Sequence, residues 1–179
     1  NQPWPRQRSV PGCRRDLSPK FKGIWMSIIL KPDIEPMEAS KITQIGAAAV
    51  CISINELGLK ATIKWPNDIV LNGKKVCGIL TEMSGELNKI NYIVMGIGIN
   101  VNIESEDFPG DIKDIATSIK IEAGEKIKRK ELVASIFNNF EQLYDEFIKS
   151  GTIKKSINIC RENSALIGND VKIIKRNEE

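Results

Sequence analysis

Residues 64–68, with the sequence KWPND, constrain the fold of this chain more than any other segment. They place a cation, an aromatic ring, a proline, an amide and a carboxylate between apolar segments at 61–63 and 69–71. Proline fixes φ, has no backbone donor and pushes the preceding residue toward an extended conformation. We therefore predict two short strands that meet at a bend, with polar side chains displayed there on a rigid scaffold.

Several other segments have the pattern of strands. Residues 23–30 form an apolar run that is typical of a buried strand, and the pair Asn72-Gly73 is a strong hairpin signal. The strands that we predict around this hairpin lie at about 61–64, 68–72, 75–83 and 91–99, with a turn near 86–89. Residues 166–175 have the pattern of one more strand.

Three segments have the pattern of helices. Pro36 is a favoured first residue, and we predict a helix from there to Gly58 in which small residues at 46–49 allow close packing on a sheet. Residues 129–150 carry a long apolar stripe at helical spacing, and a further helix is expected near 153–161. Helices combined with a mixed, largely antiparallel sheet predict an α+β fold.

The composition of the chain excludes several classes of protein. It has 179 residues, of which 41% are hydrophobic and 27% charged, and its net charge of +3 is too small to indicate nucleic-acid binding. No apolar run has the length of a membrane span and no signal peptide is visible, so we expect a cytoplasmic protein. The four cysteines form no CxxC pair and there is no histidine, which argues against a zinc site and excludes a histidine-based triad.

Three motifs together resemble the biotin–protein ligase family. They are KWPND at 64–68, NGKKVCGILTE at 72–82 and VMGIGINVN at 94–102, and the resemblance extends from about Ser18 to the C-terminus. It implies a fold like that of biotin ligases and class II aminoacyl-tRNA synthetases. It also implies a catalytic domain at 18–163 and the start of a small SH3-like C-terminal domain at 164–179.

The resemblance implies an ATP-dependent ligase with two steps. Biotin and ATP form biotinyl-AMP and pyrophosphate, and the biotin then passes to a lysine of the biotin carboxyl carrier protein of acetyl-CoA carboxylase. Biotin and ATP are thus the expected substrates. Mg²⁺ is expected only with ATP, because the sequence shows no dedicated metal-binding cluster.

The charged residues of the first two motifs have roles in such a reaction. Because a carboxylate and a triphosphate repel each other, cations must neutralise them. The resemblance assigns Lys75 to the biotin carboxylate and the α-phosphate, and Lys64 to the nucleotide phosphates. Asp68 is expected to orient the acceptor lysine and take its proton, because an amine with a pKa of about 10.4 is protonated at neutral pH. Ordinary turn lysines and a structural, turn-capping carboxylate are the alternative interpretation.

The remaining predicted site residues are mostly uncharged. The GIGIN segment is neither a Rossmann fingerprint nor a P-loop, so its glycines are expected to admit ligand against the backbone. By resemblance, ATP contacts Lys64, Trp65, Asn67, Gly96, Gly98 and Asn100, and biotin contacts Lys75, Gly78, Ile79, Leu80 and Ile97. Asn67 has a second interpretation as a residue that fixes the loop, and Trp25 is expected to pack on the sheet.

Residues 1–17 depart from the family pattern. The family has a glycine- and arginine-rich loop, approximately GRGRRGRxW, just before the position of Ser18, and this loop closes over the adenylate. The chain has NQPWPRQRSVPGCRRDL instead. A one-base shift in the codons from Trp4 to Val10 can read Gly-Gln-Gly-Arg-Gly-Arg, so we hypothesise a reading-frame error that the coding DNA would reveal.

Two other functions stay open at this point. A lipoate–protein ligase has a related fold and the same adenylation chemistry, although KWPND followed by GIGIN favours biotin. A non-catalytic fragment with an interface or regulatory role is the other alternative, because the loop is missing and the C-terminal domain is short. Some family members carry a winged helix that represses transcription, but nothing here resembles it. We expect a homodimer, because edge strands in this fold often pair two ligase domains.

Overall fold

The computed structural model describes residues 21–86 and 89–170. Within them, five strands form one sheet in the order β1-β5-β4-β3-β2, and every neighbouring pair is antiparallel. The strands are β1 (Ile24–Leu30), β2 (Thr62–Lys64), β3 (Asp68–Leu71), β4 (Lys74–Glu86) and β5 (Lys89–Ile99). Two isolated parallel bridges, Ile63 with Ser164 and Lys75 with Ala116, make the overall pairing mixed. The α+β fold predicted from the sequence is thereby confirmed.

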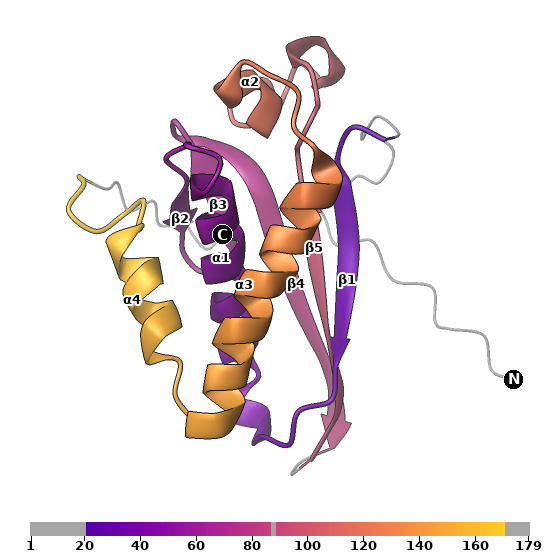
Figure 1. Cartoon of the computed structure of the whole chain (residues 1–179), viewed down its shortest axis with the longest axis vertical. Coiled ribbons are helices and arrows are strands. Elements are labelled where there is room, and N and C mark those ends of the chain that lie inside the picture. Colours follow the sequence, from indigo (N-terminus) through magenta and orange to yellow (C-terminus); the bar gives the residue numbers. More distant parts are fainter. Residues whose placement is uncertain (1–20, 87–88, 171–179) are drawn as a thin grey trace, which may run out of the picture.

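The helices lie mainly on one side of this sheet (Figure 1). They are η2 (Pro36–Glu38), α1 (Ser40–Asn55), η3 (Ser105–Asp107), α2 (Ile119–Ala123), α3 (Arg129–Ser150) and α4 (Lys154–Glu162). Helix α1 packs directly on the sheet, and α3 and α4 pack against α1. Among the described residues, no helix combines the length and the apolar character that crossing a bilayer requires.

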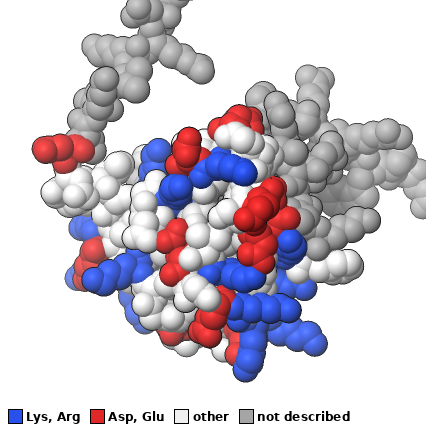
Figure 2. Space-filling view, turned by 90° about the horizontal axis from the view of Figure 1, so that it is seen from above, with Lys and Arg blue, Asp and Glu red and all other residues white. Residues whose placement is uncertain are grey.

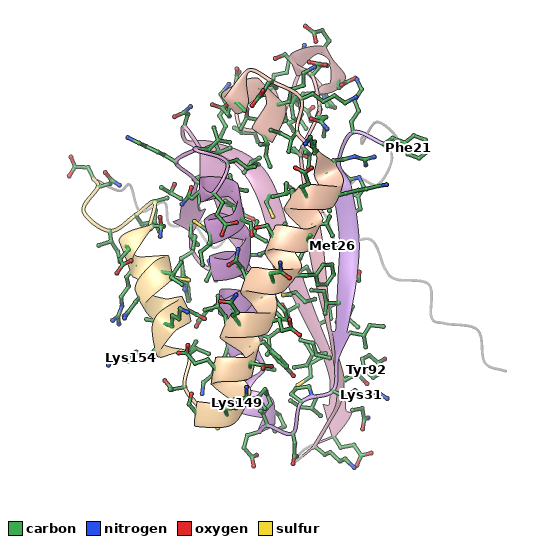
Figure 3. The ribbon with its side chains drawn as sticks, viewed as in Figure 1. Phe21, Met26, Lys31, Tyr92, Lys149 and Lys154 are labelled. Carbon is green, nitrogen blue, oxygen red and sulfur yellow. The ribbon has the colours of Figure 1, made fainter. Side chains whose placement is uncertain are left out.

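Small residues let α1 approach the sheet closely. Residues Ala47, Ala48 and Ala49 are fully buried, as the sequence predicted. A Cβ atom added to Gly46 would lie 2.5 Å from the Sδ atom of Met95 in β5, so a larger residue there would require the Met95 side chain to move. The core between α1, α3 and the sheet also takes in the partly buried Met26 of β1 (Figure 3).

The two faces of the sheet differ in their side chains. On β5, Ile93, Met95, Ile97 and Ile99 are buried on the side of α1, whereas the alternate residues Val94, Gly96 and Gly98 are partly exposed on the other side. Strand β1 likewise turns Trp25 and Ile29 to solvent. Alternation along a strand places successive side chains on opposite faces. We call the face away from α1 the open face.

The predicted elements differ from the observed ones at several places. Strands β4 and β5 are longer than expected, because they continue as a two-stranded ribbon past the point where β1 ends at Leu30. The sequence did not predict α2 or η3. Residues 166–169 form a turn rather than a strand, and Gly168 there has a φ of 81°. The rest of that predicted strand, at 171–175, lies outside the described residues, as do the atypical residues 1–17.

A buried amide fastens the end of β5 to the start of α3. Asn102 is 8% exposed, and its side chain donates to the carbonyl of Ile127 at 2.9 Å and accepts from the Ile127 N–H at 2.9 Å. Asn102→Ala would leave both backbone groups without these partners, and we expect it to lower the free energy of unfolding by about 2–3 kcal/mol. Urea denaturation measures the change. The exposed Asn91→Ala should stay within about 0.5 kcal/mol, and equal effects for the two variants would contradict this account.

Candidate active site

A row of five residues, one from each strand, crosses the open face. The register pairs Trp25 with Gly98, Gly98 with Gly78, Gly78 with Asp68 and Asp68 with Lys64. Residues that lie directly opposite each other on neighbouring strands share a face of the sheet. The row therefore begins with an indole ring, continues over two glycines and ends with a carboxylate and an ammonium group.

The glycines leave a strip of backbone without side chains on this face. The next pair of opposite residues along the strands contains Gly96 and Leu80. A Cβ atom at Gly98 would lie 2.8 Å from Cζ3 of Trp25, and one at Gly78 would lie 3.2 Å from Nζ of Lys75. Trp25 and Lys75 thus lie over the strip from opposite ends, while Trp25 stays 58% exposed. The sequence predicted that Trp25 packs on the sheet, and this contact confirms it.

A β-bulge explains why Lys75 and Gly78 share a face. Val70 pairs with Lys75 and Ile69 pairs with Cys77, so that the pairing skips Val76. Val76 and Cys77 are consecutive, yet each is only 1% exposed. In a regular strand, residues three apart point to opposite faces. The extra residue turns the side chain of Lys75 to the same face as Gly78, which is a known effect of bulges.

Lys75 and Asp68 form an ion pair above the glycine strip. The Nζ atom of Lys75 lies 2.6 Å from Oδ1 of Asp68, and both side chains are partly exposed. Exposed ion pairs contribute only about 0–1 kcal/mol, so an anionic ligand can replace Asp68 as the partner of Lys75 at little cost. Lys64 stands opposite Asp68 in β2 and is exposed. The pair thus supplies a movable cation beside a carboxylate.

Asn67 fixes the bend between β2 and β3. Its side-chain amide donates to the carbonyl of Ile79 at 2.8 Å, and its own carbonyl accepts from the Ile79 N–H at 3.0 Å. The Trp65–Pro66 peptide bond within the bend is cis. Trp65 is exposed, as a residue displayed at a bend should be. The geometry therefore matches the interpretation of Asn67 as a loop-fixing residue, one of the two that the sequence left open.

Asn100 is also engaged by the protein. Its side-chain amide donates to the carbonyl of Thr117 at 3.0 Å, and its backbone N–H donates to Val76 at 2.9 Å. Asn100 thus holds the bulge residue Val76 while it stands at the end of β5.

The predicted site residues divide between the two faces. Lys75, Gly78, Leu80, Gly96 and Gly98 lie on the open face with Asp68 and Lys64. Ile79 and Ile97 lie on the other face, where their side chains pack in the core. The structure therefore does not bring these two side chains to the strip, because each adjoins a glycine that faces outward.

Neither thiol chemistry nor a clustered metal site is present among the described residues. Burial raises the pKa of Cys77 far above its ordinary value, and burial raises that of Cys51 to about 12, so both thiols stay protonated. Within residues 21–86 and 89–170, no three acidic or cysteine side chains gather as metal ligands would. Chemistry at the strip thus depends on the lysines and Asp68.

The end of the molecule that carries α2 also bears many of the described charged side chains (Figure 2). Over the end of the molecule that carries α2, positive and negative side chains are interspersed (Figure 2). A hollow of about 760 Å³ lies there between Lys22, Asn102 and Lys128, and none of the residues of the row lines it. Three of its lysines, Lys22, Lys120 and Lys128, are paired with acidic side chains.

Comparisons with known proteins agree with the motifs and the fold. The model of the biotin/lipoate A/B protein ligase family matches residues 14–100. The chain is 46% identical over 135 residues to the bifunctional ligase/repressor BirA of Bacillus subtilis, covering 75% of this chain and 42% of that protein. It is 31% identical over 133 residues to a biotin–[acetyl-CoA-carboxylase] ligase of Paracoccus denitrificans, covering 68% of this chain and 53% of that one.

A solved structure has the same architecture. The biotin protein ligase from Aquifex aeolicus in complex with biotin and ATP superposes with a TM-score of 0.69 and 26% identity, covering 80% of this chain and 59% of that chain. The chain spans about half the length of the curated relatives it matches. Motifs, sheet topology and these relatives lead to one conclusion, that the chain belongs to the biotin/lipoate A/B protein ligase family.

Proposed function

We propose that this chain carries the catalytic part of an ATP-dependent biotin–protein ligase. The single observation that supports this most is the Lys75–Asp68 ion pair above the strip formed by Gly78, Gly96 and Gly98. A relative with the same fold is named as a complex with biotin and ATP. A flat or extended substrate can lie against a strip of backbone that carries no side chains.

In the first step, Lys75 would neutralise two anions that must meet. A carboxylate oxygen of biotin attacks the α-phosphorus of ATP, and the bond from that phosphorus to the bridging oxygen breaks, which releases pyrophosphate. Lys75 leaves Asp68 to contact the biotin carboxylate and the α-phosphate, where it stabilises the charge that develops. Lys64 stands at the end of the row to support the nucleotide phosphates. Mg²⁺ would arrive with ATP as part of the substrate.

In the second step, Asp68 would act on the acceptor. The lysine nitrogen of a biotin carboxyl carrier protein attacks the carbonyl carbon of biotinyl-AMP, and AMP leaves with the electron pair of the broken bond. The attacking ammonium must first lose a proton, which Asp68 accepts as a general base. The carrier domain is the proposed partner, and a homodimer of ligase domains is the proposed assembly.

The apolar part of the ligand would lie toward the indole end of the row. Trp25 and Leu80 are exposed apolar side chains on the open face. A ligand pocket needs apolar surface with a few placed polar groups. Ile79 and Ile97 lie opposite each other, and each is next to a glycine of the strip. Their backbone can therefore contact the ligand although their side chains pack in the core.

Removing the cation should abolish the first step. We expect Lys75→Ala to lower biotin-dependent ATP–pyrophosphate exchange by about 100-fold or more, because one stabilising group at the developing charge is lost. Lys74→Ala is the matched control, since the neighbouring ammonium only reaches the carbonyl of Lys113, and it should stay within about threefold. A similar loss in both variants would contradict the assignment. No exchange from the folded wild-type chain would favour the non-catalytic alternative.

Removing the base should affect the two steps unequally. Asp68→Asn is expected to slow transfer of biotin to a carrier-domain lysine by about 100-fold or more, because the general base is gone. Pyrophosphate exchange should fall much less, since Lys75 no longer has to leave a carboxylate. Single-turnover transfer from preformed biotinyl-AMP measures the second step alone. Equal losses in both assays would show that Asp68 is only structural.

Ligand selectivity distinguishes a biotin ligase from a lipoate ligase, the two types of ligase that the name of the family includes. One of the curated relatives matched above is named a biotin–[acetyl-CoA-carboxylase] ligase. We expect pyrophosphate exchange to be stimulated by biotin and not by lipoate at the same concentration. Exchange with lipoate alone would make the lipoate–protein ligase the correct alternative.

A further inference from the structure

The carboxylate of Glu122 in α2 joins two segments that are far apart in sequence. Its Oε2 atom accepts from the side-chain amide of Asn72 at 2.5 Å, and its Oε1 atom accepts from the hydroxyl of Thr117 at 2.6 Å. Asn72 forms the tip of the β3–β4 hairpin with Gly73, and both have positive φ. Thr117 is only 2% exposed. Glu122 therefore ties the hairpin to the segment that precedes α2.

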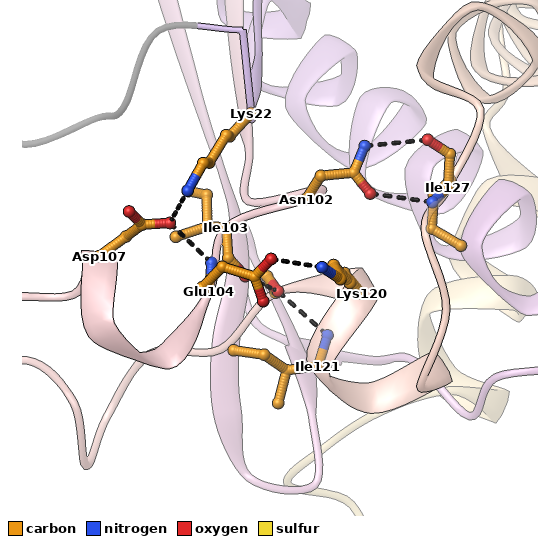
Figure 4. A network of polar contacts seen from close by, with 9 residues as sticks. Lys22, Asn102, Ile103, Glu104, Asp107, Lys120, Ile121 and Ile127 are labelled. Atoms are coloured by element: carbon orange, nitrogen blue, oxygen red, sulfur yellow. Dashed lines mark hydrogen bonds and ion pairs between the residues drawn. The ribbon is translucent and has the colours of Figure 1, made fainter.

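Helix α2 is a firm support for this carboxylate, although it has only five residues. Its first two N–H groups donate to the carbonyls of Asn100 and Val101, and the Ser118 hydroxyl accepts from Ile121 and donates to Ile103. The ion pair of Lys120 with Glu104 and the contacts of Asn102 with Ile127 extend the network (Figure 4). Glu122 thus reaches the hairpin from a helix that is fastened to the end of β5.

The two segments that Glu122 joins hold the backbone of Lys75. The Lys75 N–H donates to the carbonyl of Ile115 at 2.8 Å, and the Lys75 carbonyl accepts from the Thr117 N–H at 2.9 Å. Asn72 lies three residues before Lys75 on the same hairpin. Both sides of Lys75 are therefore linked to one carboxylate.

We propose that Glu122 is a positioning residue for Lys75, and this inference rests on the proposed function. By holding Asn72 and Thr117 together, it fixes the backbone from which the Lys75 ammonium reaches over Gly78. Glu122 itself touches neither substrate. Without it, the hairpin tip and the 115–117 segment lose this side-chain link, and Lys75 is held less firmly at the strip.

The first test uses hydrogen–deuterium exchange of the full chain without ligand. Glu122→Ala should speed exchange of the Lys75 and Thr117 amides by about tenfold or more, as expected when hydrogen bonds of ordinary strength are lost. The amide of Met95 in the core should be unchanged. Glu122→Gln should behave like the wild type, because its oxygen can accept from Thr117 and its amide can donate to a turned Asn72 side chain. Glu125→Ala removes an exposed carboxylate three residues away and is the matched control.

The second test uses biotin-dependent pyrophosphate exchange in the same variants. A loosened Lys75 should raise the KM for biotin by about tenfold in Glu122→Ala and by less than about threefold in Glu122→Gln. Partial unfolding would instead lower kcat with KM unchanged. Uniform acceleration of all amides, no acceleration, or no rescue by glutamine would overturn the positioning role. If the wild type shows no pyrophosphate exchange, the proposed function fails, and the deuterium experiment still decides whether Glu122 fixes Lys75.

Discussion

The one extra residue at Val76 is the constraint on which the site depends. Because the register skips it, the apolar side chains of Val76 and Cys77 both enter the core, and Lys75 and Gly78 both face outward. Without the skip, either Lys75 would point into the core or a glycine would be lost from the open face. Burying an unpaired ammonium is far more costly than distorting a strand pair locally. Core burial therefore enforces the geometry that places a cation over backbone.

Much of the surrounding structure serves to hold that distortion in place. A bulge interrupts the regular hydrogen bonds of a strand pair. Here Asn100 donates to the carbonyl of Val76, and the 115–117 segment takes both backbone groups of Lys75. Asn67 binds the bend of the neighbouring hairpin to Ile79. Two other parts of the chain thus bond three backbone groups of the irregular segment, and Asn67 fixes the strand beside it.

Local signals predicted the framework, whereas the site itself depends on long-range register. Asn72-Gly73 encodes its hairpin through turn chemistry, and the stripe on α3 encodes that helix through its period. Nothing local indicates that Asp68 and Lys75 meet, because their contact depends on a bulge. Alternation from Gly78 and Gly98 would have placed Ile79 and Ile97 in the core, but the family resemblance drew attention to them as ligand contacts. Helix α2 is too short for a periodic pattern, although Ser118 and Gly124 at its ends are ordinary caps.

The ion pair also suggests how the proposed two steps would follow each other in order. Lys75 carries one positive charge, for which Asp68 and a ligand anion compete. While the site holds no anion, the Lys75 ammonium lies 2.6 Å from Oδ1 of Asp68 and occupies that carboxylate. Once Lys75 moves to the biotin carboxylate and the α-phosphate, Asp68 loses that partner and becomes free to receive the proton of an incoming amine. Formation of the adenylate would thus itself prepare the base for transfer, with no larger rearrangement than the movement of one lysine side chain.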